Sequence, residues 1–367
     1  MKTMPALVIG GGPAGSIAAL RLARGGMRTL LIERNRQGHD PVCGGFMSAD
    51  ALRLLRQSGI DTGQLGGHPV GTMRFAVGER VLETALPFPA IGLSRRRLDA
   101  ILIEAARGVG AAVEFGRTAR AIDSTRAVSF ADGENVAAGA IMLATGKLNL
   151  RGADRPGEPA RGSAKIGLRR ALRPNATCAA KLAGTIEIHL FADGYAGLVL
   201  QEDGALNLCL SVGSARLRDA GGSPDRLLSI ITDEAPLFGE RIAAATPSGD
   251  WRSIARIPYG WRASETAPGL FRIGDQAAVI ASLAGDGIAI AIASAIAASD
   301  ALLRGGPAAA PAYQRDFARR ARRPLVLAEL LRRIAETPIF ARAAAHILGL
   351  HPGLLAWGAR ATRIAAA

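Results

Sequence analysis

The chain opens with Ala6-Leu7-Val8-Ile9-Gly10-Gly11-Gly12-Pro13-Ala14-Gly15, an apolar run that leads into a glycine-rich turn. Apolar residues then recur at helical spacing over residues 16–23, and a second apolar run, residues 29–32, ends at Glu33. Glu33 stands 18 positions after Gly15. A strand, a G-x-G-x-x-G turn, a helix, a strand and an acidic residue in this register predict a Rossmann-type site for an adenine dinucleotide.

The three glycines of the turn have separate physical roles. Gly10 permits the tight turn, Gly12 lets the backbone approach a pyrophosphate, and Gly15 lets the helix pack closely on the strand. Unpaired N–H groups at the start of the helix present partial positive charge to the phosphates. Glu33 is expected to accept a hydrogen bond from a ribose hydroxyl.

Length and composition are those of an α/β protein with an ample core. The chain has 367 residues, of which 49% are hydrophobic and 4% aromatic, enough for one large domain or two interleaved ones. We see no signal-peptide pattern and no run of about 18 apolar residues, so we expect no membrane-spanning segment. Cys43, Cys178 and Cys209 lack metal-ligand spacing, so we expect no metal site and a cytoplasmic, reducing location.

The formal net charge of +14 raises the question of an anionic partner. Only four of the 45 basic residues are lysines, and the arginines are spread along the whole sequence. No basic stretch is interleaved with the aromatic residues that stack on bases. We therefore expect no nucleic-acid binding, whereas anionic cofactors and lipid headgroups are compatible with this charge.

Further segments belong with the opening unit. Residues 91–99 lead into an apolar-periodic helix at residues 100–107. Residues 140–146 and 269–275 are short apolar runs that end in turns, as buried parallel strands do. A long apolar helix follows at residues 288–303. The nucleotide-binding fold is therefore discontinuous in sequence.

Different material lies between these segments. Residues 156–175 are rich in Pro, Gly and Arg and are interpreted as a linker. Alternating runs between Gly184 and Val212, separated by turn residues, predict a β-meander. After Pro311 the pattern is helical.

The predicted fold class is α/β, with a Rossmann-like dinucleotide-binding domain interleaved with a β-sheet substrate domain, plus C-terminal helices. The dinucleotide-binding domain is assigned to residues 1–75, 90–155 and 265–310. The substrate domain is assigned to residues 76–89 and 156–264, and the C-terminal helical region to residues 311–367.

Taken together, these motifs resemble FAD-dependent oxidoreductases of the p-hydroxybenzoate hydroxylase fold, a superfamily of flavoprotein monooxygenases and geranylgeranyl reductases. The resemblance covers residues 4–310 and rests on four elements: the glycine turn with Glu33-Arg34, Cys43-Gly44-Gly45, Ser94-Arg95-x-x-Leu98-Asp99, and Gly274-Asp275 followed by Gly285-Asp286-Gly287. It implies FAD as the cofactor and NADPH or NADH as the electron donor.

The resemblance also implies a set of cofactor-binding residues. These are Gly10, Gly12, Pro13, Ala14, Gly15, Glu33, Arg34, Cys43, Gly44, Arg95, Ala119, Gly274, Asp275, Gly285, Gly287 and Ile288. Within this set, Asp275 is expected to accept a hydrogen bond from a ribityl hydroxyl, and Ala119 to lie beside the adenine. The helix that starts at Ile288 is expected to direct its N–H groups at the flavin N1–C2=O edge.

The sequence departs from the family pattern at several positions. Ala278 and Ser282 stand where the family has histidine and proline, which makes this turn less rigid. The Asp-Gly motif that the hydroxylases use around NAD(P)H is absent, and Thr145-Gly146-Lys147 stands near its place. The Trp-x-Trp-x-Ile-Pro signature of flavin halogenases is absent too, so halogenation is set aside.

Two reactions fit the resemblance. In the first, a monooxygenase hydroxylates an apolar, aromatic or polyketide-derived molecule with O₂ through a flavin C4a-hydroperoxide. In the second, a geranylgeranyl reductase-like enzyme reduces a C=C bond of a lipophilic substrate. Cys43-Gly44-Gly45 resembles the reductases, whereas residues 194–212 and 274–280 are more similar to bacterial hydroxylases found beside polyketide pathways, in secondary metabolism. We favour the first, and a non-catalytic FAD-binding redox sensor is a third interpretation.

No catalytic acid or base is fixed by the sequence. Tyr195 is a candidate to position a substrate oxygen, Asp286 to manage protons beside the flavin turn, and Cys43 to act as a thiol near the flavin. Each also has a structural interpretation: a packed tyrosine, a solvent-facing carboxylate and a small packing residue.

The C-terminal tail, residues 319–363, mixes large apolar residues with arginines. Such a basic amphipathic pattern is typical of helices on an anionic membrane, where they would collect a lipophilic substrate. The other interpretation, which we favour, is that these helices cover the substrate domain as ordinary core helices.

Overall fold

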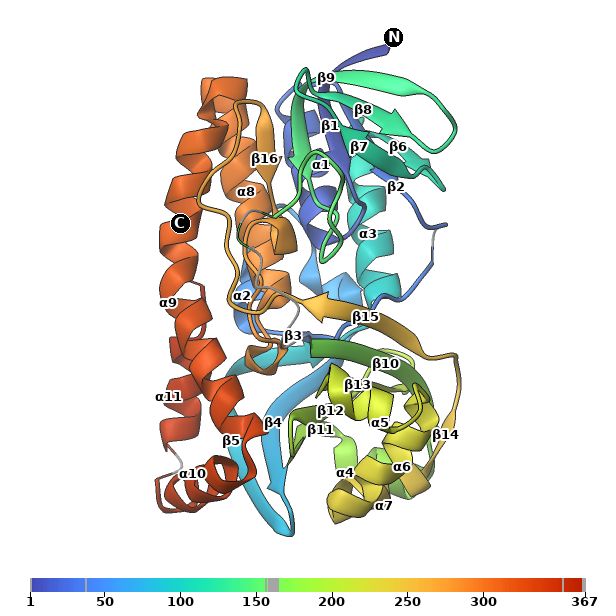
Figure 1. Ribbon diagram of the computed structural model, residues 1–367, viewed down its shortest axis with the longest axis vertical. Helices are drawn as coiled ribbons and strands as arrows, with labels where there is room; N and C mark the ends of the chain where they lie inside the picture. The colour runs from blue at the N-terminus through green and yellow to red at the C-terminus, as the bar shows by residue number, and fades with distance from the viewer. Residues whose placement is uncertain (1, 37, 156, 158–164, 352, 365–367) are drawn as a thin grey trace.

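The computed structural model describes residues 2–36, 38–155, 157, 165–351 and 353–364. It contains two β-sheets stacked end to end, with a layer of long helices along one side of both (Figure 1). The helix α9 (Ala310–Glu336) runs along one side of the molecule and contacts both sheets (Figure 1).

The first sheet has seven strands, with β6-β2-β1-β9-β8-β7 along its path and β16 paired to β9. Pairs among β1, β2, β6, β9 and β16 are parallel, and β7 and β8 are added antiparallel. Its strands are β1 (Lys2–Ile9), β2 (Thr29–Glu33), β6 (Ala112–Phe115), β7 (Ala119–Ile122), β8 (Ala127–Phe130), β9 (Asn135–Leu143) and β16 (Leu270–Arg272). This is the discontinuous parallel sheet that the apolar runs predict.

Helices cover one face of the first sheet and form the largest core cluster with it. They are α1 (Pro13–Arg24), α2 (Ala49–Gln57), α3 (Arg95–Gly108) and α8 (Gly287–Gly305). The strands β7 and β8 pack with β1, β2 and β9 in a second core cluster. Short 3₁₀ turns are η1 (Thr62–Leu65), η3 (Gly274–Gln276), η4 (Ser282–Ala284) and η5 (Pro307–Ala309).

One described helix, α8, is long and apolar enough by composition to cross a membrane, which the sequence reading did not anticipate. It packs against α1, α2 and α9, and more than half of its most apolar window is buried (56%). Burial on several sides requires an apolar helix in a protein core as well as in a bilayer. Its apolar character is therefore explained by its place in the core.

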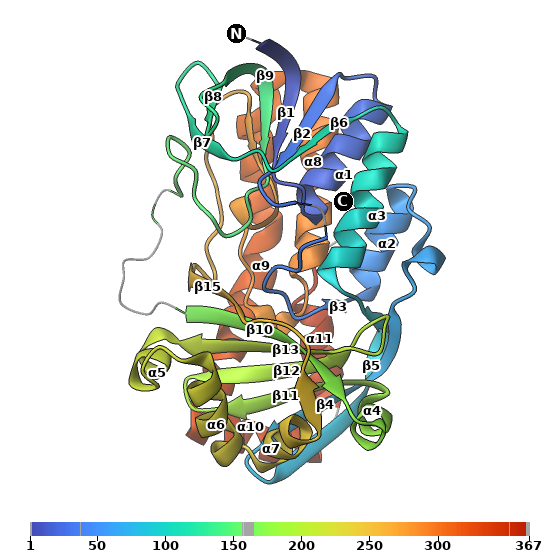
Figure 2. The same ribbon diagram turned by 90° about the vertical axis from the view of Figure 1, so that its right-hand side faces the viewer.

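The second sheet has nine strands, in the order β14-β10-β13-β12-β11-β4-β5-β3 with β15 paired to β10 (Figure 2). They are β3 (Phe46–Met47), β4 (His68–Val77), β5 (Arg80–Gly92), β10 (Lys165–Pro174), β11 (Gly184–Phe191), β12 (Gly194–Leu200), β13 (Leu206–Gly213), β14 (Ala245–Pro247) and β15 (Arg252–Ile257). The antiparallel run β11-β12-β13 is the predicted β-meander.

Four helices cover one face of the second sheet and form its core with alternate strand residues. They are α4 (Ala176–Leu182), α5 (Ser214–Asp219), α6 (Pro224–Glu234) and α7 (Pro236–Ala243). The other face turns toward the first sheet. Beyond α9, the chain ends in α10 (Pro338–Leu350) and α11 (Gly353–Ala361), which contact β5.

Two sequence expectations about organisation are corrected. The linker at residues 156–175 is wrong for its second half, because residues 165–174 form β10 inside the second sheet, while residues 156 and 158–164 lie outside the described residues. The division at residue 76 falls within β4, because the β4–β5 hairpin joins the second sheet through a parallel pair with β11. Short alternation in β4 was too weak to reveal this long-range pairing.

Candidate functional site

A cavity of about 630 Å³ is lined by residues of both sheets and of the loops between them. This volume lies within the range of ligand and cofactor sites. One wall is built from the glycine turn after β1, the end of β2 and the starts of α3 and α8. The opposite wall is the open face of β10–β13.

The glycine turn has the geometry of a phosphate cradle. Gly10 has a φ of +109°, and a Cβ there would lie 2.4 Å from the carbonyl oxygen of Ala144. A Cβ at Gly15 would lie 1.8 Å from the carbonyl oxygen of Gly10. The helix α1 begins at Pro13 with no side chain capping its first N–H groups. These amides are therefore available to an anion at the cavity wall.

Glu33 is held beside this cradle by three hydrogen bonds. The amide of Gly11 donates to its Oε2 at 2.7 Å. The backbone and side-chain nitrogens of Asn35 donate to Oε1 at 2.9 and 2.7 Å. The carboxylate thus stands at the end of β2 and lines the cavity, where a ribose of a dinucleotide would lie.

Arg95 supplies a fixed positive charge near the cradle. Its guanidinium donates to both oxygens of Asp99 at 3.0 and 2.8 Å, and a Cβ built at Gly12 would lie 3.0 Å from its Nη2. Burial works against the charged form, but Asp99 raises the pKa of Arg95 above its usual value. Arg95 is therefore a permanent cation at the cavity wall beside Cys43 and Gly44.

A second uncapped helix start meets the same cavity. Gly285 has a φ of +66° and Gly287, the first residue of α8, has open space where a Cβ would be. Asp286 precedes α8 but does not cap it, because its carboxylate is bonded elsewhere. The first N–H groups of α8 therefore offer partial positive charge to a group in the cavity.

The structure places Asp286 away from the cavity, in the protein interior. Its carboxylate accepts hydrogen bonds from Arg363 Nη1 at 2.8 Å, the Ile364 amide at 3.0 Å and Ser48 Oγ at 3.1 Å. Burial raises its pKa even though Arg363 lies beside it. Asp286 thus anchors residues 363–364, and neither its candidate role in managing protons beside the flavin turn nor a solvent-facing position fits this geometry.

Asp275 lines the cavity at the turn η3, as the motif predicts. Lys147 Nζ lies 3.0 Å from its Oδ2. Burial works to lower the pKa of Lys147, but Asp275 raises it above its ordinary value, so this lysine is charged. Gln276 ties the two loops together, because its side-chain nitrogen donates to the carbonyls of Gly146 and Leu148 at 3.0 and 2.8 Å.

The opposite wall combines apolar residues with a small set of hydroxyl groups. Tyr195, Gly197, Cys209 and Ser211 are paired across β12 and β13 and share one face of the sheet. Apolar side chains around them include Ile186, Ile188, Ile254 and Ile257. No atom lies closer than 3.8 Å to the place of a Cβ at Gly197, so the absence of a side chain there enlarges the cavity.

The hydroxyl groups of this wall form a chain that the sequence reading missed. Tyr259 Oη lies 2.7 Å from Ser282 Oγ and 3.3 Å from Ser211 Oγ. Tyr195 is buried, and its Oη has no hydrogen-bond partner among the described residues. Burial raises the pKa of Tyr195 well above its usual value and outweighs the opposite effect of the nearby Ser282 and Ser211 hydroxyls, so the tyrosine stays protonated and able to donate. No local motif joins these residues, which come from four separate segments.

Nearly the whole predicted cofactor set lies on the cavity wall. The residues found there are Gly10, Gly12, Pro13, Ala14, Glu33, Arg34, Cys43, Gly44, Arg95, Ala119, Gly274, Asp275, Gly285, Gly287 and Ile288. Gly15 lies behind the wall, where it lets α1 approach the turn. Of the catalytic candidates, Tyr195 and Cys43 line the cavity and Asp286 does not.

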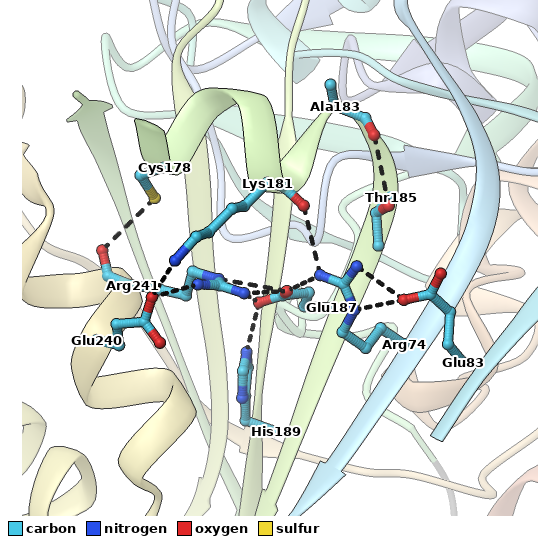
Figure 3. Close-up of polar contacts among 10 residues, drawn as sticks. All are labelled: Arg74, Glu83, Cys178, Lys181, Ala183, Thr185, Glu187, His189, Glu240 and Arg241. Atoms are coloured by element: carbon cyan, nitrogen blue, oxygen red, sulfur yellow. Dashed lines mark hydrogen bonds and ion pairs between the residues drawn. The ribbon is translucent and has the colours of Figure 1, made fainter. Parts of the chain in front are cut away.

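Behind the substrate wall, on the helix-covered face of β11, lies a buried ionic cluster (Figure 3). Glu187 is fully buried and accepts hydrogen bonds from Arg241 Nη2 at 3.2 Å and His189 Nε2 at 3.1 Å, and also from Arg74. Burial works to raise its pKa, but these three partners lower the pKa to about 2. The cluster ties α7 and β4 to the strand that carries Ile186 and Ile188 into the cavity.

The residues present fit FAD. The cavity brings two uncapped helix starts to one space, with side-chain-free backbone at Gly12, Gly44 and Gly287 and a fixed cation at Arg95. A diphosphate at α1 and an electron-rich ring edge at α8 are the groups of an extended flavin dinucleotide that such helix starts stabilise.

Comparison with known proteins agrees with this assignment. A family model described as FAD binding domain matches residues 3–144. The chloroplastic geranylgeranyl diphosphate reductase of Oryza sativa subsp. japonica is 40% identical over 115 residues, a match that spans 30% of this chain but only 24% of the relative.

Two solved structures share the fold over most of both chains. A geranylgeranyl bacteriochlorophyll reductase-like protein from Thermoplasma acidophilum has a TM-score of 0.75 at 19% identity and covers 92% of this chain and 89% of its own. The flavin-dependent brominase Bmp2 has a TM-score of 0.80 at 17% identity and covers 98% and 93%. At these identities the likeness defines the fold and leaves the reaction open.

The cradle, the paired helix starts, the matched FAD-binding segment and the shared architecture lead to one assignment. The chain contains an FAD-binding domain over residues 3–144 and has the fold shared by these two solved structures.

Proposed function

We propose that this FAD-binding protein is an FAD-dependent oxidoreductase of the p-hydroxybenzoate hydroxylase fold, and that it is a monooxygenase that hydroxylates a lipophilic, phenol-like molecule. The observation that carries the proposal is the group of hydroxyls on a largely apolar cavity wall, where the buried Tyr195 Oη lies near Ser211 and Ser282 but makes no hydrogen bond of normal geometry among the described residues. A buried hydroxyl without a partner costs free energy, and a substrate oxygen would remove that cost. The neighbouring chain of Tyr259, Ser282 and Ser211 offers further hydrogen bonds at the same place.

Bound FAD would supply the redox chemistry, by accepting a hydride from NADPH or NADH and by reacting with O₂. The net reaction adds one oxygen atom to the substrate and releases the other as water, with oxidation of one nicotinamide. The chain's own residues bind the cofactor and the substrate, orient the substrate and shield the reaction from water. The start of α8 would stabilise negative charge on bound flavin, and Ile186, Ile188 and Ile257 exclude water from the cavity.

The hydroxyl wall supports a phenol-like substrate because ring hydroxylation depends on the oxygen already on the ring. A protonated Tyr195 donates a hydrogen bond to that oxygen and so fixes the ring orientation. Tyr259 and its two serine partners can hold or pass the phenol proton, because each hydroxyl both donates and accepts. An isoprenoid double bond has no oxygen at the reacting carbons and does not need such a wall.

A second candidate is reduction of a C=C bond in a lipophilic substrate. It is favoured by the local match to a geranylgeranyl diphosphate reductase and by Cys43, a thiol at the cavity wall that would supply the proton. In that reaction a hydride and a proton are added across the double bond, and no O₂ is consumed.

One experiment separates the two reactions. The FAD-loaded protein is reduced without oxygen by NADPH or NADH while the flavin absorbance is followed, and alkylphenols or polyprenyl alcohols are then supplied with or without O₂. The monooxygenase proposal predicts faster reoxidation with the alkylphenol and a product heavier by one oxygen atom. Anaerobic formation of a product with two added hydrogens would instead select the reductase.

The Tyr195→Phe variant tests the proposed substrate contact. Loss of one hydrogen bond to a substrate oxygen is expected to lower kcat/KM by about tenfold. FAD affinity and the rate of flavin reduction should not change. Tyr313→Phe is the matched control, since Tyr313 is equally buried but donates to the carbonyl of Arg272 in the core. Equal losses in both variants would contradict a contact with substrate.

A further inference from the structure

The end of the chain presents an unusual amount of apolar surface. Large side chains on α10 and α11 are mostly solvent-exposed, with Ile339 at 77% and Leu350 at 65% of their full area. Phe340, Ile347 and Trp357 are more than half exposed as well. Scattered exposed apolar residues are ordinary, but so many on two adjacent helices indicate a surface that something covers.

The helix α10 is amphipathic, but its large apolar residues face solvent, whereas those of a core helix face the protein. It buries the small residues Ala341 and Ala345 against the protein, where α10 contacts β4, β5 and β11. At 100° per residue, Ile339, Phe340, Ile347 and Leu350 fall on the opposite side and point to solvent. A sequence that needed only to cover the substrate domain would place its large residues inward.

Charge distinguishes between the possible occupants of this surface. No aspartate or glutamate occurs between Thr337 and Ile364, while Arg342 and Arg360 are exposed there. Arg80, in the β4–β5 hairpin, adds a cation beside α10 through its contact with His346 at 3.3 Å. A second copy of this chain, itself at +14, would bring like charges together. An anionic lipid surface supplies both apolar depth and opposite charge.

We propose that α10 and α11 form a peripheral membrane-binding surface for anionic bilayers. Ile339, Phe340 and Leu350 enter the headgroup–acyl boundary, and Arg342 and Arg360 pair with lipid phosphates. The surface is independent of which reaction the flavin site performs. It is joined to that site because Arg363, just past α11, holds Asp286 between the two glycines that line the cavity.

The test is flotation of the full-length, FAD-loaded protein with vesicles. One set is phosphatidylcholine alone and the other is equal parts phosphatidylcholine and phosphatidylglycerol. The protein should float with the anionic vesicles and should detach as salt is raised. The double variant Ile339→Ser/Phe340→Ser is expected to bind on the order of tenfold more weakly or worse. Both residues are exposed, so flavin content should stay at the wild-type level.

The matched control is Ile230→Ser, on α6, which removes an exposed apolar side chain from a different surface. This variant should float like the wild type. Arg342→Glu/Arg360→Glu should abolish the preference for anionic vesicles. Failure of the wild type to bind anionic vesicles at low salt would overturn the proposal. Equal binding by the Ile339/Phe340 variant, or a dimer that dissociates when these residues are changed, would overturn it too.

Discussion

The substitution Glu187→Gln tests how the substrate wall is held in place. Glu187 is the fully buried centre of the ionic cluster behind β11, between Arg241 of α7 and Arg74 of β4 (Figure 3). Glutamine keeps the size and one accepting oxygen but removes the negative charge. Arg241, itself only 6% exposed, then has no full counter-charge at this position. An unpaired buried charge is strongly destabilising.

The magnitude follows from the pKa of Glu187, which the cluster lowers from 4.5 to about 2. That difference corresponds to about 3 kcal/mol of stability for the folded protein with Glu187 ionised, at about 1.4 kcal/mol for each pH unit. Because the folded-state pKa is the lower one, this contribution is present in full above pH 4.5. It is lost progressively as the pH falls from 4.5 toward 2.

Urea unfolding of the wild type and the variant, at neutral pH and at about pH 3, measures both the loss of stability and its pH dependence. Near neutral pH, Glu187→Gln should lower the free energy of unfolding by about 3 kcal/mol. At about pH 3 the difference in unfolding free energy between the two proteins should be smaller, because the wild type loses the stability that ionised Glu187 contributes. Glu83→Gln is the matched control, since Glu83 pairs with the same Arg74 at 2.7 Å but is half exposed. Its loss should be about 1 kcal/mol or less.

Two results would refute the reasoning. One is a loss for Glu187→Gln no larger than the loss for Glu83→Gln. The other is a stability difference between wild type and Glu187→Gln that stays constant across the acid range, which would mean that the Glu187 charge is not linked to folding.

Three further predictions concern the cavity. Gly197→Leu should fill the open space at the substrate wall and lower kcat/KM by tenfold or more, with unchanged FAD binding by titration; undiminished turnover would mean that substrate lies elsewhere. Gly15→Ala should yield protein without flavin colour, because its Cβ would lie 1.8 Å from the Gly10 oxygen; a normal flavin spectrum would contradict this. Arg363→Ala should free Asp286 and weaken FAD binding by about tenfold or more, with partial rescue in Arg363→Lys, and unaltered FAD affinity would separate this ion pair from the flavin loop.

Much of the cofactor half of the molecule is readable from the chain. The turn at Gly10–Gly15, Glu33 at the end of β2, and the Gly274-Asp275 turn are each defined within a few residues. They need specific backbone geometry, and only glycine supplies the space that Ala144 and the Gly10 oxygen leave there. Because these backbone requirements are local, a short sequence motif is enough to predict them. The alternation of residues in β11–β13 predicts the meander for the same reason.

The contacts that give the site its chemistry were decided by tertiary structure. Tyr259 meets Ser211 and Ser282 from positions 48 and 23 residues away, and Arg363 meets Asp286 across 77 residues. Side-chain pairs so far apart in sequence depend on how the sheets and helices stack. No rule of sequence spacing predicts them. For this reason the sequence left Asp286 open between a residue that manages protons beside the flavin turn and a solvent-facing carboxylate, whereas the fold buries it.

The C-terminal tail, residues 319–363, also shows which features follow from the sequence and which depend on the tertiary structure. The sequence mixes arginines with large apolar residues there, a pattern that suits a helix on an anionic membrane as well as the core helices that we favour from the sequence. The packing agrees with the favoured interpretation for α9, which buries Leu325 and Ala328 and contacts β11 and β12. It differs for α10, which contacts the same sheet through the small residues Ala341 and Ala345 and leaves its large residues facing outward. A helix shows its periodicity in sequence, but which side its neighbours cover is a property of the assembled fold.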